Sequence, residues 1–274
     1  MRPTVICVMS TMRSGSTWLN LVLGSHSWAA SLGEYFRPFL VPGHVACRLC
    51  EADGLPACTM LDGIEAVPAE QAYAFAAERM ARDVVIDASK HLVWYRRFID
   101  RQDLDLRLVH LVRHPCGFVE SEMRRNAGAT PDTLLAEWVR VNGEIEEFIA
   151  TSGRPAMLTC YEGLADDPAR YFPPLCAFAG GAWEPDAMRY WEVPHHGLGG
   201  NGAASLYLRG RGVVRYVTGD DAYYRNLEAQ PTAADARWKS RLPEEFRRRA
   251  VASPYAQACM ERLGDARWEA PMIH

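Results

Sequence analysis

Three features of the sequence predict an α/β fold in which a central parallel sheet is flanked by helices in three layers. Short aliphatic or β-branched runs alternate with longer segments of helical periodicity over the first two thirds of the chain. These runs are apolar at consecutive positions, as is typical of parallel strands buried on both faces. A length of 274 residues with 49% hydrophobic content is also enough to bury a full core.

Four apolar runs are the candidate strands. They read PTVICVM (3–9), DVVIDAS (83–89), LRLVHLV (106–112) and PAMLTCY (155–161). Because segments with helical spacing separate them, we expect right-handed crossover connections. The sheet should contain four or five parallel strands.

The candidate helices lie between and after these runs. They cover residues 16–26, 68–82, 115–126 and 131–150, and residues 243–264 predict one closing helix with a basic face. Pro115 and Pro131 begin two of them, at a position where a helix loses no hydrogen bond to proline.

We expect a single domain, 1–274, with two irregular insertions. Residues 37–68 are rich in Pro, Gly and Cys, and residues 194–220 contain the sequence HHGLGGNGAAS. Long ordered loops in such a fold usually cover a ligand site. The two insertions are therefore expected to cover a ligand site.

Charge and hydropathy exclude several classes of protein. A formal net charge of −4 provides no bulk attraction to nucleic acid or an anionic membrane, so neither partner is expected. No stretch approaches the roughly 20 apolar residues of a membrane span, and the first residues lack the apolar core of a signal peptide. A cytoplasmic protein is the default expectation, and isolated cysteines such as Cys7 and Cys160 fit reduced core thiols.

The turn after the first candidate strand, MRSGSTW (12–18), has the composition of an anion-binding loop. Backbone N–H groups at a helix N-terminus attract an anion, and Gly15 lets the backbone approach it closely. The pattern G-x-x-x-x-G-K-[ST] of nucleoside triphosphatases is absent, because Arg13 replaces the lysine beside the magnesium-binding hydroxyl. An ordinary triphosphatase is disfavoured, and a strand-to-helix turn with capping serines is the structural alternative.

Three motifs together resemble those of sulfotransferases that use 3′-phosphoadenosine 5′-phosphosulfate (PAPS). MRSGSTWL resembles the family's 5′-phosphosulfate loop, RHPCGFVES its 3′-phosphate motif, and TCYEGLADDP its Tyr-Glu-Asp-Leu segment. Each motif follows a candidate strand, and their order is that of the family. The resemblance covers residues 3–180 and implies the P-loop-like sulfotransferase fold of the bacterial members.

The resemblance implies a site for the donor PAPS and its product, adenosine 3′,5′-bisphosphate (PAP). Arg113 and Ser121 are spaced so that a strand-end guanidinium and a hydroxyl two turns into the next helix can converge on one phosphate. Arg209 and Arg211 complete that pocket in this interpretation, and an exposed basic loop fits them equally. The implied donor residues are Arg13, Ser14, Gly15, Ser16 and Thr17 at the phosphosulfate, Trp18 and Tyr161 at the adenine, and Arg113, Ser121, Arg209 and Arg211 at the 3′-phosphate.

Sulfuryl transfer requires in-line positioning of the acceptor, removal of its proton and stabilisation of charge on the departing oxygen. By resemblance, Glu34 in GEYF is the candidate base, and Lys90 in DASKHL is the candidate cation beside the bridging oxygen. Lys90 is also one of only two lysines in an arginine-rich chain. His91 is a lower-ranked base, because adjacent side chains of an extended segment point to opposite faces.

The acceptor is expected to be a hydroxyl or amine of a small molecule, glycan or natural product. Tyr35 and Phe36 follow the candidate base, and His195 and His196 lie in the second insertion, where solvated loop histidines are the alternative. Direct in-line transfer requires no metal.

A group of potential metal ligands lies in the first insertion: His44, Cys47, Cys50 and Cys58. Their types and number fit a structural zinc site, although the interval from Cys50 to Cys58 is longer than in a usual zinc knuckle. A disulfide and free thiols are the other two possibilities, and a reducing compartment disfavours the disulfide.

Two other functions stay open at this point. A P-loop small-molecule kinase or phosphotransferase needs magnesium ligands, for which Asp87 is the one candidate. A non-catalytic protein that binds a bisphosphate nucleotide would keep its affinity after Glu34→Ala or Lys90→Ala and would show no turnover.

Overall fold

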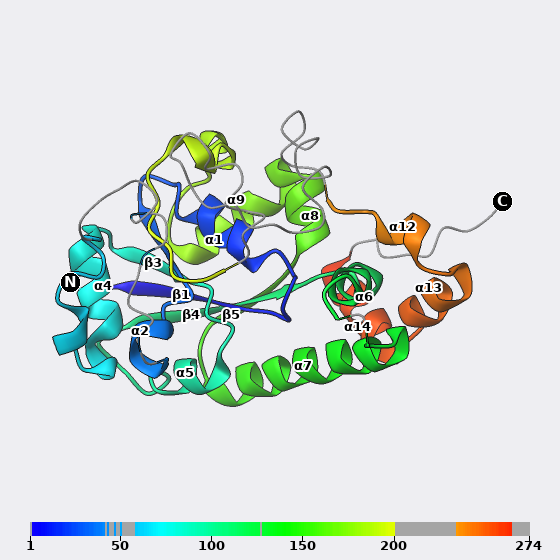
Figure 1. Cartoon of the computed structure of the whole chain (residues 1–274). Coiled ribbons are helices and arrows are strands. Elements are labelled where there is room, and N and C mark those ends of the chain that lie inside the picture. Colours follow the sequence, from blue (N-terminus) through cyan, green and yellow to red (C-terminus); the bar gives the residue numbers. More distant parts are fainter. Residues whose placement is uncertain are drawn as a thin grey trace.

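The computed structural model describes residues 2–41, 43, 47, 50, 58–126, 128–200 and 234–264. Its centre is a parallel five-stranded sheet with helices on both faces (Figure 1). In spatial order the strands are β2 (Ala29–Gly33), β3 (Val84–Asp87), β1 (Thr4–Met9), β4 (Asp105–Val112) and β5 (Ala156–Cys160). The predicted three-layer α/β class is confirmed.

All four candidate strands are present, and β2 is a fifth strand that the sequence did not reveal. Its sequence, AASLG, contains no β-branched or aromatic residue and so has little intrinsic preference for a strand. It pairs with β3 from Ala29 opposite Val84 to Gly33 opposite Asp87, with a register shift after Ser31. Pairing with β3 therefore determines its conformation.

The central strand β1 is buried on both faces. Val5, Cys7 and Met9 belong to one hydrophobic cluster, and Ile6 and Val8 belong to another, each with no exposed surface. Successive side chains of a strand point to opposite faces of the sheet. This double burial explains why the sequence is apolar without interruption.

Helices from different parts of the chain cover the two faces (Figure 1). One face packs against α1 (Ser16–Leu23) and α9 (Pro168–Ala179). The other packs against α4 (Ala72–Met80), α5 (Leu92–Arg96) and α7 (Pro131–Ser152).

Several shorter helices complete the described part of the chain. They are α2 (Arg37–Leu40), η1 (Ile64–Ala66), η2 (Ala69–Gln71), α6 (Pro115–Met123), α8 (Tyr161–Asp166), η3 (Pro185–Met188), η4 (Tyr190–Glu192) and α12 (Trp238–Arg241). As the sequence predicts, α6 and α7 begin with proline. Among the helices described, none is both long enough and apolar enough to cross a membrane.

The single closing helix predicted for residues 243–264 is wrong. The structure has two helices there, α13 (Glu244–Val251) and α14 (Pro254–Leu263). Ser253 is extended, with φ −63° and ψ 139°, because the ring of the following Pro254 disfavours the helical conformation at that position. The chain therefore turns between the two helices, which pack together against α6 and α7.

Candidate active site

The loop between β1 and α1 has the backbone of an anion-binding turn. Gly15, with φ 85°, precedes α1, whose N-terminus has no side-chain cap among the described residues and no acid in its first turn. The partial positive charge of the helix end is therefore available to a ligand. A Cβ atom on Gly15 would lie 2.5 Å from the Tyr161 ring, so only glycine fits this position.

The two predicted phosphate motifs meet at this loop. Arg13 Nε donates to Ser121 Oγ at 3.1 Å, across 108 positions of the chain. Arg113 Nη1 donates to the backbone carbonyl of Arg13 at 2.6 Å, across 100 positions. Because β1 and β4 are neighbours in the sheet, the loops that follow them form one continuous site.

Arg113 is buried, and its hydrogen-bonding capacity is only partly used. The side chain is 6% exposed, and its Nε and Nη2 atoms have no hydrogen-bond acceptor among the described residues. The guanidinium also lies over the Tyr161 ring, 5.0 Å from its centroid. Buried donors normally find a partner, so this arrangement suits an anionic ligand such as phosphate.

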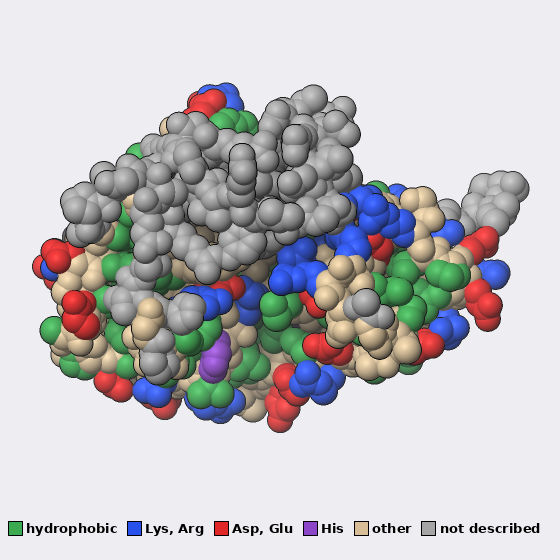
Figure 2. Space-filling model, viewed as in Figure 1, with side chains coloured by type: hydrophobic (Ala, Val, Ile, Leu, Met, Phe, Trp, Pro, Cys, Tyr) green, Lys and Arg blue, Asp and Glu red, His purple; other side chains and the backbone are tan. Residues whose placement is uncertain are grey.

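The carboxylate of Asp235 lies among three arginines, one of which is Arg113. Its Oδ2 atom is 2.7 Å from Arg237 Nη2, 3.4 Å from Arg113 Nη2 and 3.7 Å from Arg124 Nη2. Burial raises the pKa of Asp235, but the hydrogen bonds from Arg237 and the charge of Arg113 outweigh it and hold the pKa well below the ordinary value of 3.8. Figure 2 shows Lys and Arg side chains gathered on this face, between α6 and α12. The group has the positive charge needed to bind a phosphate.

The two residues assigned to the adenine contact each other. Trp18 and Tyr161 are in edge-to-face contact, with ring centroids 6.0 Å apart, and Trp18 also contacts Phe172 at 6.0 Å. Trp18 is only partly buried, which leaves part of its ring accessible. Since Trp18 is the last residue of the segment 12–18, the aromatic pair lies at the end of this loop.

Glu34 and Lys90 form a buried ion pair at the carboxyl ends of β2 and β3. Lys90 Nζ is 3.0 Å from Glu34 Oε1, and the two side chains are 12% and 13% exposed. Arg37 Nε donates to the other carboxylate oxygen at 2.7 Å. Burial raises the pKa of Glu34, but Lys90 and Arg37 together hold it below the ordinary value of 4.5, so the group is a carboxylate at neutral pH.

Two of the predicted site residues have an unusual backbone. Among the described non-glycine residues, Arg13 (φ 64°), Lys90 (φ 58°) and Ala81 (φ 50°) have positive φ. This conformation costs an L-residue roughly 1–2 kcal/mol and is concentrated at functional sites. Tyr95 supports it at Lys90, since its hydroxyl accepts from Lys90 N at 3.2 Å and donates to Asp87 O at 3.1 Å.

The neighbours of the candidate catalytic pair differ in accessibility. His91 Nδ1 accepts from Trp94 N at 3.3 Å at the start of α5, and its ring lies 4.9 Å from that of Phe36. Tyr35 is fully buried and donates to Ala72 O at 3.3 Å. We therefore retain Phe36, and not Tyr35, as a candidate for acceptor contact.

His195 and His196 have different surroundings. His195 is buried, and its ring nitrogens lie within hydrogen-bonding distance of Tyr190 O (2.7 Å) and Ser31 Oγ (3.2 Å). Its contacts are therefore those of a core histidine. His196 Nδ1 instead lies beside the Cys50 and Cys58 thiols. His44, Arg209 and Arg211 lie outside the described residues.

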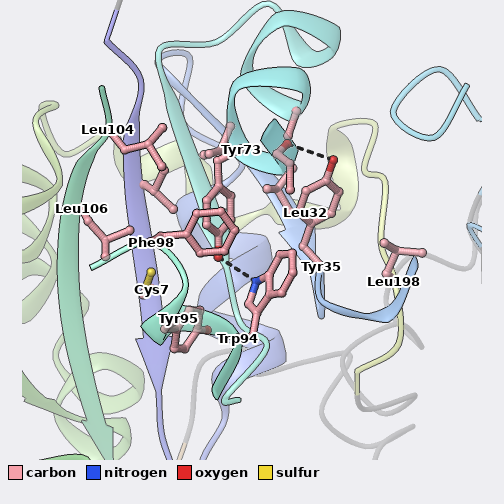
Figure 3. Packing of buried hydrophobic residues seen from close by; sticks show 14 of the residues in the cluster. Cys7, Leu32, Tyr35, Tyr73, Trp94, Tyr95, Phe98, Leu104, Leu106 and Leu198 are labelled. Carbon is pink, nitrogen blue, oxygen red and sulfur yellow. Dashed lines mark hydrogen bonds between the residues drawn. The ribbon is translucent and has the colours of Figure 1, made fainter. Parts of the chain in front are cut away.

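Asp87, the candidate magnesium ligand of a kinase, is occupied by protein donors. Its fully buried carboxylate accepts from the Tyr73 hydroxyl at 2.6 Å and from Trp94 Nε1 at 3.0 Å. Ser89 N donates to it at 2.7 Å. Figure 3 shows Tyr73 and Trp94 side by side and hydrogen-bonded within the aromatic cluster. Burial, the largest effect, raises the pKa of Asp87, and the carboxylate serves to hold the core together.

Some residues of the site were not found from the sequence. Arg124 had a usable signal, because it lies three positions after Ser121 on the same helix face and donates to its Oγ at 3.3 Å. Asp235 and Arg237 had none, since they belong to none of the motifs in the sequence. Leu198 accepts from Glu34 N at 2.6 Å and aligns the candidate base, a contact that only the folded chain provides.

Comparison with known proteins identifies the fold. Neither protein-family models nor curated proteins give a match to this sequence. Among solved structures, the sulfotransferase domain from the curacin biosynthetic pathway matches with a TM-score of 0.60 and 20% identity, over 96% of this chain and 98% of that domain. The sulfotransferase domain from the Synechococcus PCC 7002 olefin synthase matches with a TM-score of 0.56 and 19% identity, over 82% of this chain and 88% of that domain. The chain therefore has the sulfotransferase fold that its three motifs imply.

Proposed function

We propose that this protein is a PAPS-dependent sulfotransferase that transfers a sulfuryl group to a hydroxyl or amine of a small-molecule, glycan or natural-product acceptor. The likeness to sulfotransferase domains supports the fold, and the residues at the strand ends support the activity. The proposed donor residues are Arg13 to Trp18, Tyr161, Arg113 and Ser121, joined by Arg124 and Arg237.

The observation that carries the proposal is that the two predicted phosphate motifs are in contact with each other. The Arg13 side chain contacts Ser121, and Arg113 contacts the backbone of Arg13, although the motifs are about a hundred residues apart in the chain. Within the described residues, the buried Nε of Arg113 has no hydrogen-bond acceptor, and its Nη2 has only an ion-pair contact at 3.4 Å with Asp235. A nucleotide with phosphate groups at both its 3′ and 5′ positions suits such a site.

The proposed chemistry uses Glu34 and Lys90. The bound donor supplies an activated sulfur, whose bond to the bridging phosphate oxygen breaks as the acceptor oxygen or nitrogen bonds to it. The Glu34 carboxylate accepts the acceptor's proton at Oε1. Lys90 and Arg37 keep the group ionised, and Oε1 accepts a hydrogen bond only from Lys90 and so has a further lone pair, whereas Oε2 accepts both Nε and Nη2 of Arg37.

Lys90 is proposed to stabilise the negative charge that develops on the departing oxygen. An ammonium group has three N–H donors, and those of Lys90 reach Glu34 Oε1 at 3.0 Å and Ala88 O at 2.8 Å. The third donor suffices for one hydrogen bond to that oxygen. Lys90 lies three residues after the end of β3, and its left-handed backbone determines the direction of its side chain.

Thermal stabilisation by nucleotides tests the proposal. A ligand that binds only the folded state raises the unfolding temperature. We expect PAP to do so at micromolar concentration without a divalent cation, and we expect ATP with magnesium to have little effect. Stabilisation by ATP with magnesium alone would instead establish the kinase alternative, which the full occupation of Asp87 disfavours.

A labelled-donor assay then separates an enzyme from a non-catalytic binding protein. Wild-type protein, a panel of hydroxyl and amine acceptors and [35S]PAPS should yield labelled product. PAP binding without product from any acceptor or from water would contradict the proposed activity.

A further inference from the structure

Four potential metal ligands, none of them a proposed donor residue, converge at one point. The sulfur atoms of Cys47, Cys50 and Cys58 and the Nδ1 atom of His196 all lie within 4.8 Å of one another. His196 is 146 positions from Cys50 and 138 from Cys58. Folding therefore brings a fourth potential ligand, His196, next to three cysteines that are close together in the sequence.

The distances within this Cys3His cluster suit a small tetrahedral ion. Nδ1 of His196 lies 3.2 Å from the sulfur of Cys50 and 3.2 Å from that of Cys58. Around zinc, with Zn–S about 2.3 Å and Zn–N about 2.0–2.1 Å, tetrahedral ligand atoms lie roughly 3.5–3.8 Å apart. The observed separations require only small side-chain movements to reach that geometry.

The surroundings of the Cys3His cluster also suit a metal. Cys47 and Cys50 are buried, and Cys58 is nearly so. Gly197 N donates to the sulfur of Cys47 at 3.3 Å, a contact that orients the sulfur and stabilises a thiolate. None of the eight cysteines, all of which the structure describes, forms a disulfide, so these three sulfurs can bind a metal.

We propose that Cys47, Cys50, Cys58 and His196 bind one zinc ion, and that this ion holds the segment containing His196 against the candidate base Glu34. Three thiolates and one imidazole form a closed donor set that zinc favours in structural sites. Binding releases three thiol protons to solvent, and the imidazole binds in its neutral form. The ion undergoes no redox change and takes no part in the transfer step.

The positioning role rests on the proposed function and on contacts next to His196. Glu34 N donates to Leu198 O at 2.6 Å, and Leu198 forms a parallel bridge with Gly33 at the end of β2. A Cβ atom on Gly199 would lie 2.5 Å from Glu34 Oε2, so the segment passes directly over the carboxylate. A metal at His196 therefore restrains the backbone that fixes the position of Glu34.

An ion is a reasonable way to order this part of the protein. Residues 193–200 contain three glycines and one short bridge but no helix or strand. Cys47, Cys50 and Cys58 belong to the Pro- and Gly-rich insertion. The described segment 193–200 has little regular hydrogen bonding of its own, whereas one ion joins it to the three cysteines.

The first test measures metal in the purified full-length protein. We expect about one zinc per chain by mass spectrometry of the metal, and X-ray absorption with about three Zn–S distances near 2.3 Å and one Zn–N distance near 2.0 Å. Replacement by Co2+ should give the visible spectrum of a tetrahedral thiolate site. Metal-free protein that takes up neither Zn2+ nor Co2+, or a mass lacking two hydrogens from a disulfide among these cysteines, would overturn the proposal.

Single substitutions assign the ligands. Cys58→Ser and His196→Asn should each weaken zinc binding by more than the roughly 10–100-fold loss typical of changes around the ligands. Cys176→Ser is the matched control, because its buried thiol lies 3.4 Å from His26 Nε2 and outside the Cys3His cluster. Wild-type zinc affinity in both ligand variants, or loss of zinc only in the control, would contradict the assignment.

A third measurement separates this inference from the proposed function. Protein stripped of zinc by a chelator should still be stabilised by PAP, because the donor loop and Arg113 follow β1 and β4, two paired strands that contain none of the four ligands. Sulfate transfer should fall at least tenfold and return when Zn2+ is restored. Unchanged transfer after zinc removal would overturn the positioning role, whereas a lack of PAP binding in the zinc-loaded protein would overturn the proposed function and leave the metal site intact.

Discussion

The donor side and the acceptor side of the candidate site are built in different ways. The donor side consists of a loop and a helix that follow β1 and β4, two neighbouring central strands. The acceptor side combines the ends of β2 and β3 with the irregular segment 194–200, next to which Cys47, Cys50 and Cys58 lie. Regular sheet pairing is sufficient to assemble the first, whereas the second depends on side-chain contacts between loops. This contrast predicts that donor binding tolerates changes that abolish transfer.

The largest expected effect is that of Glu34→Gln on transfer. Removal of a general base costs typically about 10²–10⁴-fold in rate, and the amide cannot accept the proton. PAP should still stabilise the variant as it does the wild type, because Glu34 lies on the acceptor side. Rates with labelled donor and melting temperatures with PAP measure the two quantities.

The control for this variant is Glu192→Gln, which changes an exposed carboxylate paired with Arg189 at 2.9 Å. It should leave both quantities unchanged. Equal loss of transfer and PAP binding in Glu34→Gln would contradict a separation of the two sides.

The next largest effect is that of Arg113→Ala on nucleotide affinity. A hydrogen bond to a charged group contributes about 1.5–3 kcal/mol, so PAP should bind roughly 10–100-fold more weakly. AMP, which lacks the 3′-phosphate, should lose much less affinity. Calorimetric titration of both ligands measures the difference.

Arg249→Ala is a suitable control because Arg249, in α13, forms an exposed ion pair with Asp132 at the start of α7. It should not affect either nucleotide. If Arg113→Ala weakened the binding of PAP and of AMP to the same extent, the assignment of Arg113 to the 3′-phosphate site would be wrong.

An effect on stability, and not on a rate or an affinity, is expected for Gly15→Ala. The left-handed backbone costs about 1–2 kcal/mol for alanine, and overpacking against Tyr161 adds about 1–3 kcal/mol. Gly153→Ala is the matched control, since Gly153 has φ 63° but open space around its Cβ position. Urea unfolding should therefore show a larger loss of the free energy of unfolding for Gly15→Ala, and equal losses would show that the Tyr161 contact has no energetic weight.

The smallest effect concerns the pH dependence of transfer. Burial raises the pKa of Glu34, but Lys90 and Arg37 hold it below 4.5, so the carboxylate stays ionised at and above that pH. Since the folded pKa is lowered, the contribution of Glu34 to stability is present above its ordinary pKa and is lost as the pH falls through the folded value. The rate should likewise fall only on the acid side.

Arg37→Met should move this acid limb to higher pH, because it removes one of the two cations that lower the pKa of Glu34. The profile of kcat/KM against pH measures the shift. Arg189→Met, which changes an exposed arginine, should leave the profile in place. A shift to lower pH in Arg37→Met would show that Glu34 is not the titrating base.

Prediction from the sequence succeeded where the signal is a continuous apolar run or a proline at the start of a helix. β1, β3, β4 and β5 were found because both faces of each parallel strand are apolar, and the starts of α6 and α7 because proline favours that position. It failed at β2, whose residues have no strand preference, and at Ser253, where the proline effect was overlooked within a helical pattern. Pairing with β3 determines the conformation of β2, and the ring of Pro254 determines that of Ser253.

The sequence by itself determined the chemistry of the donor side, because Arg13, Gly15, Arg113 and Ser121 lie in short motifs whose positions after parallel strands bring them to one edge of the sheet. The sequence also placed Cys47, Cys50 and Cys58 close together as potential metal ligands. Only the tertiary structure decided that Asp235 pairs with Arg113, that Lys90 pairs with Glu34, and that His196 joins the three cysteines. The physical reason is that side-chain contacts between irregular segments have no period or fixed spacing, so only the packed chain defines them.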